Sequence, residues 1–179
     1  MQNIMSNTER RIIDLVVKYG SQRGDDAKYG TYRMEFFDAD FTMEGERIKW
    51  IVKQEYADGT GWFLQVVTQT KDGYEYEYLF RDCTEEAQQW MAEWVVILAE
   101  ATEIERKYDD RPFDEVVKEI EESGIHICNR GADYYDNGSI DISTEHIGCL
   151  MIGITNEDKT VILSDTQVML QGKITNIIL

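Results

Sequence analysis

The sequence predicts an α+β fold, and three observations support this. Hydrophobic residues recur at helical spacing near the N-terminus, and again after Asp82. Between these stretches, from Thr31 to Arg81, apolar and polar residues alternate, and Gly45, Gly59 and Gly73 mark turns at regular intervals. We therefore expect an N-terminal helix, a four-stranded antiparallel meander with two packed helices, and a β-rich C-terminal portion.

The first helix is predicted by its start, its stop and its apolar stripe. Ser6-Asn7-Thr8-Glu9 has the spacing of a capping box, and Gly20 supplies a stop. Between them, Ile12 and Ile13 recur with Val16 and Val17 at helical intervals. These features predict a short amphipathic helix over residues 7–19.

Four strands are expected next, over residues 31–36, 47–56, 62–70 and 74–81, because the apolar residues there have a period of two. The fourth strand differs from the others. Three tyrosines, at positions 74, 76 and 78, share one of its faces, whereas Glu75 and Glu77 lie on the other. The tyrosine row is typical of a core or a protein interface.

Two further helices follow the sheet. Asp82 and Glu85 have a spacing like that of a capping box, and the first helix is expected to end near Tyr108. Pro112 suits the first turn of the second helix, which Gly124 ends. The inner stripe of the first helix is Ala87, Trp90, Met91, Trp94, Leu98 and Ala101, and its outer side carries Glu85, Gln89, Glu93, Glu100 and Glu103.

Beyond Gly124 the sequence consists of short β-like segments with Asn-Gly and polar turns between them. These segments are residues 125–129, 139–143, 147–155, 160–163, 167–170 and 173–178. We therefore divide the chain into residues 1–123 and a β-rich subdomain of residues 124–179. A core of that size is marginal alone, so we expect the second portion to pack on the first or to extend its sheet.

The overall charge restricts the partners of this protein. With 179 residues and a net charge of −17, the chain should repel nucleic acid and anionic membranes, so its partners are expected to be basic proteins. Its apolar runs are too short to span a membrane, and no secretion signal is recognisable. Three widely spaced cysteines do not form a disulfide framework, which favours a reducing cytoplasm.

The negative charge is concentrated between Asp72 and Glu122. This stretch holds 17 of the 35 acidic residues against five basic ones, a net charge of −12. It can be a solvated face, a surface for a basic partner, or a cation store, although an exterior stripe does not converge its carboxylates as storage requires. On a helix, residues i and i+7 lie about 10.5 Å apart. The residues expected to contact a partner are Glu75, Glu77, Glu85, Glu93, Glu100, Glu103, Asp109 and Asp110.

A small, strongly acidic chain of this kind resembles, in overall character, the anti-CRISPR and anti-restriction inhibitors encoded by phages and mobile elements. The likeness is carried by Asp72 to Glu77, the outer side of Glu85 to Glu105, and Asp109 to Glu122. Several such inhibitors resemble DNA in charge and block the nucleic-acid channel of a nuclease. The resemblance implies a binding protein that inhibits a nucleic-acid-processing defence enzyme.

The alternative hypothesis is a structural or catalytic zinc site. His126 and Cys128 form His-x-Cys, and His146 and Cys149 form His-x-x-Cys, within a short stretch of chain. A strand would direct His126 and Cys128 to one face. The same alternation is also typical of a half-buried strand with a packed cysteine. Elemental analysis for zinc distinguishes the two interpretations.

No other cofactor is expected, and the protein is expected not to be an enzyme. The chain has no phosphate-binding loop, nucleophile elbow, His-Glu-x-x-His sequence or dinucleotide-binding glycine pattern. Residues 133–141 partly resemble a calcium loop, but Tyr135 replaces an oxygen donor and Thr144 occupies the twelfth position. An Asn137-Gly138 hairpin turn is the competing interpretation.

The sequence alone makes one prediction about the acidic stretch. Reversing the charge at Glu93, Glu100 and Glu103 should abolish partner binding and leave thermal stability nearly unchanged, because all three are expected on the outer side of a helix. Binding assays and thermal unfolding measure the two effects. Full inhibition by the triple variant would contradict the role assigned to these residues.

Overall fold

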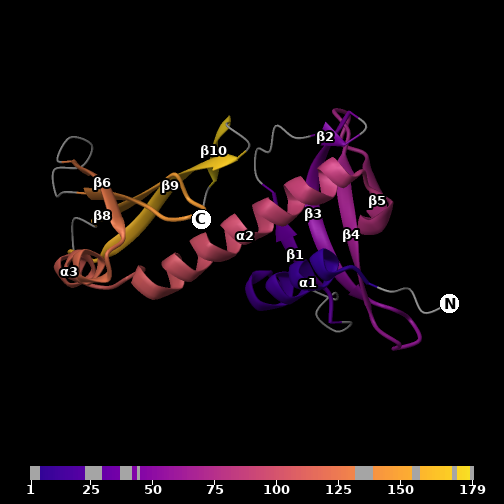
Figure 1. Cartoon of the computed structure of the whole chain (residues 1–179), viewed down its shortest axis with the longest axis horizontal. Coiled ribbons are helices and arrows are strands. Elements are labelled where there is room, and N and C mark those ends of the chain that lie inside the picture. The colour runs from indigo at the N-terminus through magenta and orange to yellow at the C-terminus, as the bar shows by residue number, and fades with distance from the viewer. Residues whose placement is uncertain are drawn as a thin grey trace. The chain divides into compact units, whose positions relative to one another are not determined.

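The computed structural model describes residues 5–22, 30–36, 42–43, 45–131, 139–154, 158–170 and 173–177, with the backbone alone at 129–131, 149, 151, 154, 162–170 and 173–177. The predicted α+β class is confirmed: an N-terminal helix precedes an antiparallel sheet and further helices (Figure 1). Contacts within the chain divide it into two compact units, Met1–Val96 and Ile97–Leu179. We describe each unit by itself.

The first unit begins with helix α1, Asn7–Tyr19. The Ser6 side chain accepts a hydrogen bond from the Glu9 backbone N–H at 3.0 Å, so the predicted cap is present. At the other end, a Cβ on Gly20 would lie 2.4 Å from the carbonyl oxygen of Val16, so glycine is required there. The helix buries Ile12, Ile13 and Val16 against the sheet, as its sequence predicts, whereas Val17 of the predicted stripe is exposed.

The sheet of this unit is the predicted antiparallel meander. Its strands are β1 (Tyr32–Glu35), β3 (Glu46–Glu55), β4 (Trp62–Gln69) and β5 (Glu75–Leu79), paired in the order β1-β3-β4-β5. A two-residue strand, β2 (Thr42–Met43), pairs with β3 and was not predicted. Because β5 pairs only with β4 among the described strands, it is an edge strand.

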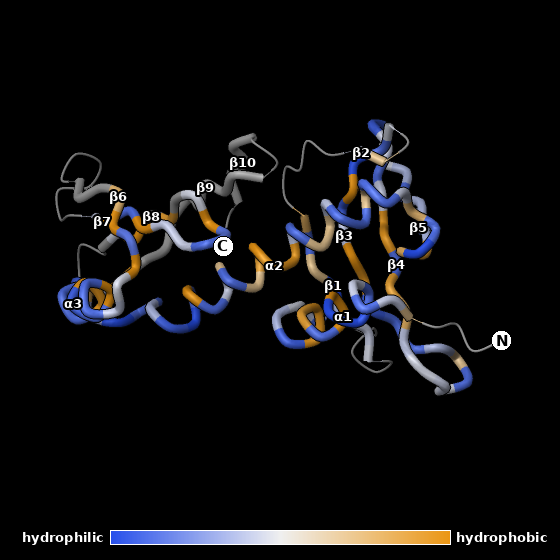
Figure 2. The backbone as a smooth tube through the Cα atoms, in the orientation of Figure 1, coloured by the Kyte–Doolittle hydropathy of each residue, from blue (hydrophilic) through white to orange (hydrophobic). Residues whose placement is uncertain are grey.

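One face of this sheet carries the core of the unit. Met34 of β1 is paired with Ile51 of β3, which is paired in turn with Val66 of β4, and all three side chains are buried. Figure 2 shows hydrophobic residues along β3 and β4 and on α1. The α1 helix contacts β1, β3 and β4. Burying this apolar surface is the main favourable contribution to folding of the unit.

A group of aromatic rings joins helix α2, Glu85–Tyr108, to the same core. Phe36 lies 5.6 Å from Trp90 and 6.3 Å from Trp94 between ring centroids, and the two tryptophans are stacked at 5.7 Å. Trp94 has no exposed surface, and Trp90 is 4% exposed. The inner stripe predicted for this helix is therefore buried, and aromatic packing contributes beyond area alone.

The start of α2 differs in detail from the predicted capping box. A short 3-10 helix, Phe80–Asp82, connects β5 to α2. The cap is Thr84, whose hydroxyl accepts from the Ala87 backbone N–H at 3.2 Å, and Gln88 donates to the Cys83 carbonyl at 2.9 Å. Asp82 belongs to the 3-10 helix instead, which is why its spacing to Glu85 misidentified the cap.

The second unit contains the C-terminal part of α2, helix α3 (Phe113–Ser123) and a second sheet. Its strands are β6 (His126–Gly131), β7 (Ser139–Ser143), β8 (Cys149–Ile154), β9 (Val161–Leu170) and β10 (Lys173–Ile177). All neighbouring strands are antiparallel, in the order β10-β9-β8-β7-β6. The two segments expected at 160–163 and 167–170 form one strand, β9.

The division between units lies inside α2, whereas the sequence predicted it after residue 123. Backbone hydrogen bonds explain why the connection between α2 and α3 belongs with the second sheet. Asp110 N–H donates to the Val161 carbonyl at 3.1 Å, Val161 N–H donates to the Arg111 carbonyl at 2.7 Å, and Phe113 N–H donates to the Lys159 carbonyl at 3.0 Å. Strands β6 to β10 thus form a sheet of their own and share a unit with α3. How the predicted portions pack on each other stays a prediction.

Within the described part of the chain, no helix combines the length and apolar character needed to cross a membrane.

The aromatic group predicts which tryptophan the first unit depends on. Trp94→Ala should lower the free energy of unfolding by about 3–5 kcal/mol, because it removes a fully buried ring from a packed core. Trp50→Ala is the control, since Trp50 is only half-buried. Urea denaturation followed by circular dichroism measures both. Equal decreases in the free energy of unfolding for the two variants would contradict the prediction that the first unit depends on Trp94.

Candidate functional site

The eight acidic residues predicted to contact a partner fall in both units. Glu75, Glu77, Glu85 and Glu93 belong to Met1–Val96, whereas Glu100, Glu103, Asp109 and Asp110 belong to Ile97–Leu179. The acidic stretch therefore spans both units, and four of its eight residues lie on the continuous helix α2.

The first surface is the β5 edge, defined as residues 72–79. Gly73 adopts a φ of 88° in the turn that leads into β5, a conformation that favours glycine. Tyr74 and Tyr76 are 68% and 49% exposed, and they are two of the three large hydrophobic residues exposed in the described part of the chain. The glutamates alternate with them at positions 75 and 77, both exposed. This edge combines aromatic surface with negative charge.

The glutamates of the β5 edge are held in place by neighbouring strands. Lys49 Nζ lies 2.6 Å from Glu75 Oε1, and Gln65 Nε2 donates to Glu77 Oε2 at 2.8 Å. Gln65 in turn accepts from Gln54 Nε2 at 2.6 Å. Such surface contacts contribute little stability, but they restrict where the carboxylates point.

The acids of α2 differ in exposure from what the sequence predicted. Glu85 is exposed in the first turn, where the helix dipole favours a carboxylate. Glu93 is half-buried, and its Oε1 accepts from Gln89 Nε2 at 2.9 Å. Glu100 is also half-buried, whereas Glu103 is exposed. Because two of the three residues are partly covered, we now expect charge reversal at Glu93, Glu100 and Glu103 to lower stability as well as any binding.

Asp109 and Asp110 lie in the turn after α2, and both are exposed. Asp110 has a φ of 59°, in the left-handed region that aspartate tolerates better than most residues. Its backbone N–H is bonded to Val161. Asp110 therefore has a structural reason for its place in the chain, in addition to its charge.

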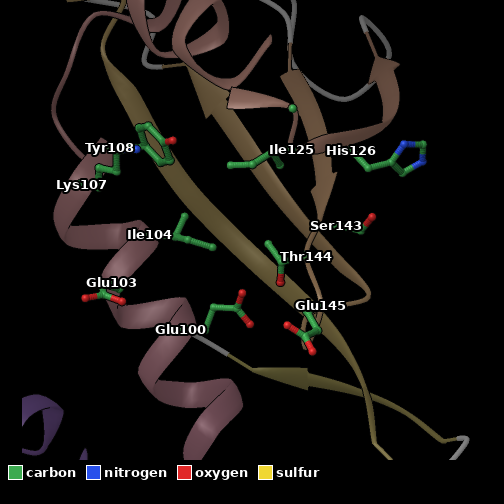
Figure 3. Close-up of a pocket in the computed structure, with 11 residues that line it drawn as sticks. Glu100, Glu103, Ile104, Lys107, Tyr108, Ile125, His126, Ser143, Thr144 and Glu145 are labelled. Carbon is green, nitrogen blue, oxygen red and sulfur yellow. The ribbon is translucent and has the colours of Figure 1, made fainter. Parts of the chain in front are cut away.

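A pocket of about 640 Å³ lies within the second unit, between the C-terminal part of α2 and residues of β6 and β7 (Figure 3). Ile104 and Ile125 supply apolar walls, and Glu100, Glu103 and Glu145 supply three carboxylates. Figure 3 shows the Glu100 carboxylate directed from α2 toward Glu145. The pocket is thus acidic on one side and apolar on the other.

Lys107 is the one lysine among the residues lining this pocket, and its ion-pair partner, Glu119, is not a lining residue. Lys107 Nζ lies 2.8 Å from Glu119 Oε1, and Arg111 binds the other oxygen of Glu119 at 2.9 Å. The Glu119 contact, and next the Tyr108 hydroxyl, raise the pKa of Lys107. The same pairing, with Arg111, lowers the pKa of Glu119. Because Lys107 is paired with Glu119, its positive charge compensates the carboxylates of the pocket only in part.

Two polar atoms of the pocket are covered without a hydrogen bond. Tyr108 is 1% exposed and its hydroxyl has no partner at hydrogen-bonding geometry, although Lys107 Nζ lies 4.8 Å from the ring centroid. Glu100 Oε2 is likewise covered and unpartnered. Figure 3 shows the tyrosine ring extending from α2 with its hydroxyl turned toward the strands. A buried polar group left unpaired costs on the order of 1–3 kcal/mol.

The predicted zinc ligands are placed only in part. His126, Cys128 and His146 are all exposed, and His126 is paired with Ser143 on β7. A bulge between Ile127 and Asn129 interrupts the alternation on which the prediction relied. Cys149 lies in β8, but its side chain is outside the described residues. Among the described residues, no three His, Cys, Asp or Glu side chains form a group that can hold a metal ion. Most of the calcium-like loop, residues 132–138, also lies outside the described chain.

A buried lysine was missed by the sequence analysis. Lys53 is 3% exposed, donates from Nζ to the Gly30 carbonyl at 3.0 Å, and lies against the rings of Trp62 and Tyr32. With Asp14 and Val17 of α1, among others, these residues line a pocket of about 440 Å³. Nothing in the sequence marks Lys53, because alternating lysines are typical of a solvated strand face. The residues of the acidic pocket were missed for a related reason, since β6, β7 and α2 meet only in the fold.

Comparison of the chain with models of protein families, with curated proteins and with solved structures finds no match. The functional argument therefore depends on the chemistry of these surfaces and pockets.

The burial of Lys53 predicts an unusual pH dependence of the free energy of unfolding. It lowers the pKa of Lys53 from 10.5 to about 8, and nearby Glu55 opposes the shift. Between these values the unfolded chain binds more protons than the folded one, so the free energy of unfolding should rise with pH. Relative to Lys53→Met, the native protein should gain about 2 kcal/mol between pH 8 and pH 10.

Urea denaturation at pH 7, 8, 9 and 10 measures this difference. Lys71→Met, at an exposed position, accounts for the general effect of removing one positive charge. A constant difference between the native protein and Lys53→Met across this range would show that the ammonium is not destabilised by burial.

Proposed function

We propose that this protein is a non-enzymatic binding protein that inhibits a nucleic-acid-processing bacterial defence enzyme, such as a CRISPR effector nuclease, by occupying a basic surface. The observation that carries the proposal is the β5 edge, where exposed Tyr74 and Tyr76 alternate with Glu75 and Glu77. This edge, supported by Glu85 at the start of α2, is the proposed contact surface.

The tyrosines support a protein contact in preference to a merely solubilising surface. Exposed tyrosine is enriched at protein interfaces, because its ring supplies apolar area and its hydroxyl a hydrogen bond at low entropic cost. A solubilising face has no need of Tyr74 at 68% exposure. Among the described strands β5 pairs only with β4, so its outer backbone edge can offer further hydrogen bonds to an extended segment.

The charge supports the kind of partner. A net charge of −17 accelerates association with a basic surface and opposes association with nucleic acid itself. An enzyme that binds nucleic acid must present a basic channel along the phosphate backbone. An acidic protein with aromatic anchors can occupy such a channel in competition with the substrate.

The proposal predicts the effect of reversing charge at the β5 edge. Purified protein is added to a panel of CRISPR effector nucleases and restriction enzymes, and DNA cleavage is measured. For an enzyme that the native protein inhibits, Glu75→Lys with Glu77→Lys should raise the inhibitory concentration at least about tenfold, since it places like charges at the contact.

The matched control reverses the same number of charges on α3. Glu115 and Glu122 are exposed, and replacing both with lysine should change the inhibitory concentration less than about threefold, as expected for charges outside the contact. Equal increases in the inhibitory concentration for the two double variants would show that inhibition depends on net charge alone. Absence of inhibition across the whole panel would contradict the proposed function.

A further inference from the structure

We propose that the pocket in the second unit binds an alkylammonium group, a primary ammonium carried on a short apolar chain. The pocket lies between α2 and the β6–β7 strands and is lined in part by Glu100, Ile104, Tyr108, Ile125 and Glu145 (Figure 3). This inference does not rest on the proposed function, because the β5 edge belongs to the other unit.

Two polar atoms of the pocket lack a hydrogen bond of normal geometry. The carboxylate oxygen Oε2 of Glu100 is covered without a partner, and an ionised carboxylate can only accept hydrogen bonds. The Tyr108 hydroxyl also has no bond of normal geometry, although it interacts with Lys107, and its side chain is 1% exposed. An ammonium can donate to the Glu100 oxygen, and a polar group farther along the same ligand can reach Tyr108, which lies about two helical turns away on α2.

The charge of the pocket selects a cation. Glu100 and Glu145 each contribute a carboxylate, whereas the pocket's lysine, Lys107, is paired with Glu119. An anion would be repelled, and a neutral donor would forgo the stronger charge-assisted bond to Glu100. The Glu100 and Glu145 carboxylates converge from opposite walls, as Figure 3 shows, so one cation can lie between them.

The apolar walls select what carries the cation. Ile104 is 9% exposed and Ile125 is half-buried, and both line the pocket beside the carboxylates. A hydrated metal ion would gain nothing from these side chains, whereas an alkyl chain would bury apolar surface against them. A volume of about 640 Å³ falls within the usual range for small-molecule sites.

The alkylammonium can come from two sources with the same chemistry. One is a free small amine, and the other is a lysine side chain of a bound protein. Two probes distinguish them: n-pentylamine represents the free amine, and Nα-acetyl-lysine methylamide represents a lysine within a chain. 1-Pentanol, of similar size and without charge, tests whether the cation matters.

Titration of the full chain with each probe, followed by nuclear magnetic resonance and calorimetry, tests the proposal. We expect a dissociation constant of about 1 mM or tighter for at least one of the amines. Chemical-shift changes should include Ile104 and Ile125, and 1-pentanol should bind at least about tenfold more weakly. Binding of both amines indicates a lysine side chain as an accepted ligand, and binding of pentylamine alone indicates a small molecule.

Three variants test the assigned contacts. Glu100→Gln should weaken amine binding about tenfold or more, because it removes a charged acceptor without changing shape. Tyr108→Phe should weaken binding of Nα-acetyl-lysine methylamide several-fold, because it removes a hydroxyl that the amides of this probe can reach. Glu85→Gln makes the same substitution at an exposed position of the same helix and should leave binding unchanged. Circular dichroism confirms that each variant is folded, and Tyr108→Phe tests the site independently if Glu100→Gln does not fold.

Specific outcomes would overturn the inference. It fails if neither amine binds the native protein at concentrations up to several times the expected 1 mM. It also fails if 1-pentanol binds as tightly as pentylamine, or if Glu100→Gln weakens binding no more than Glu85→Gln. Loss of inhibition in the β5-edge variant leaves this result unaffected, so the two proposals fail separately.

Discussion

Helix α2 has to bury apolar side chains in two separate cores while it keeps its carboxylates hydrated, and much of the structure follows from that constraint. In the first unit it contributes Trp90 and Trp94, which stack with Phe36. In the second unit it contributes Ile104 and Tyr108, both buried. With 24 residues it is long enough to serve both. Its glutamates are consequently held on a fixed backbone, several of them partly covered by neighbouring side chains.

Concentrated negative charge is only partly compensated within the chain. Lys49 neutralises Glu75, and Lys107 with Arg111 neutralises Glu119, but these pairs lie at or near the surface. Pairs of this kind contribute about 1 kcal/mol or less, so they do not offset the repulsion among 17 acids in one stretch. A basic partner would relieve that repulsion. The exposed tyrosines of the β5 edge provide the apolar anchor that charge alone does not supply.

The buried polar atoms give the pocket a significance separate from the surface charge. Within the described residues, three buried side-chain atoms have no hydrogen-bond partner: Trp94 Nε1, Glu100 Oε2 and the Tyr108 hydroxyl. Folded proteins leave few such groups, because each costs on the order of 1–3 kcal/mol. For Trp94, the packing of its buried ring offsets the free-energy cost of leaving Nε1 unpaired. The other two atoms both line one pocket, where a ligand can satisfy them together.

The sequence predicts most of the secondary structure, because most elements depend on local signals: the cap at Ser6, the period-two alternation in the sheet, Pro112 before α3, and the glycine turns. It also located the negative charge. It did not predict β2, the Thr84 cap or the division inside α2, since backbone bonds such as that between Asp110 and Val161 join distant residues.

Packing between distant segments sets which acids are exposed, where the pocket lies and how Lys53 is buried. A helical period assigns a face to each residue, but it cannot say what packs beside that face. Glu93 and Glu100 were expected to be solvated on this basis, and neighbouring side chains cover them in part. Composition and periodicity are properties of one segment, whereas a site is made where several segments meet.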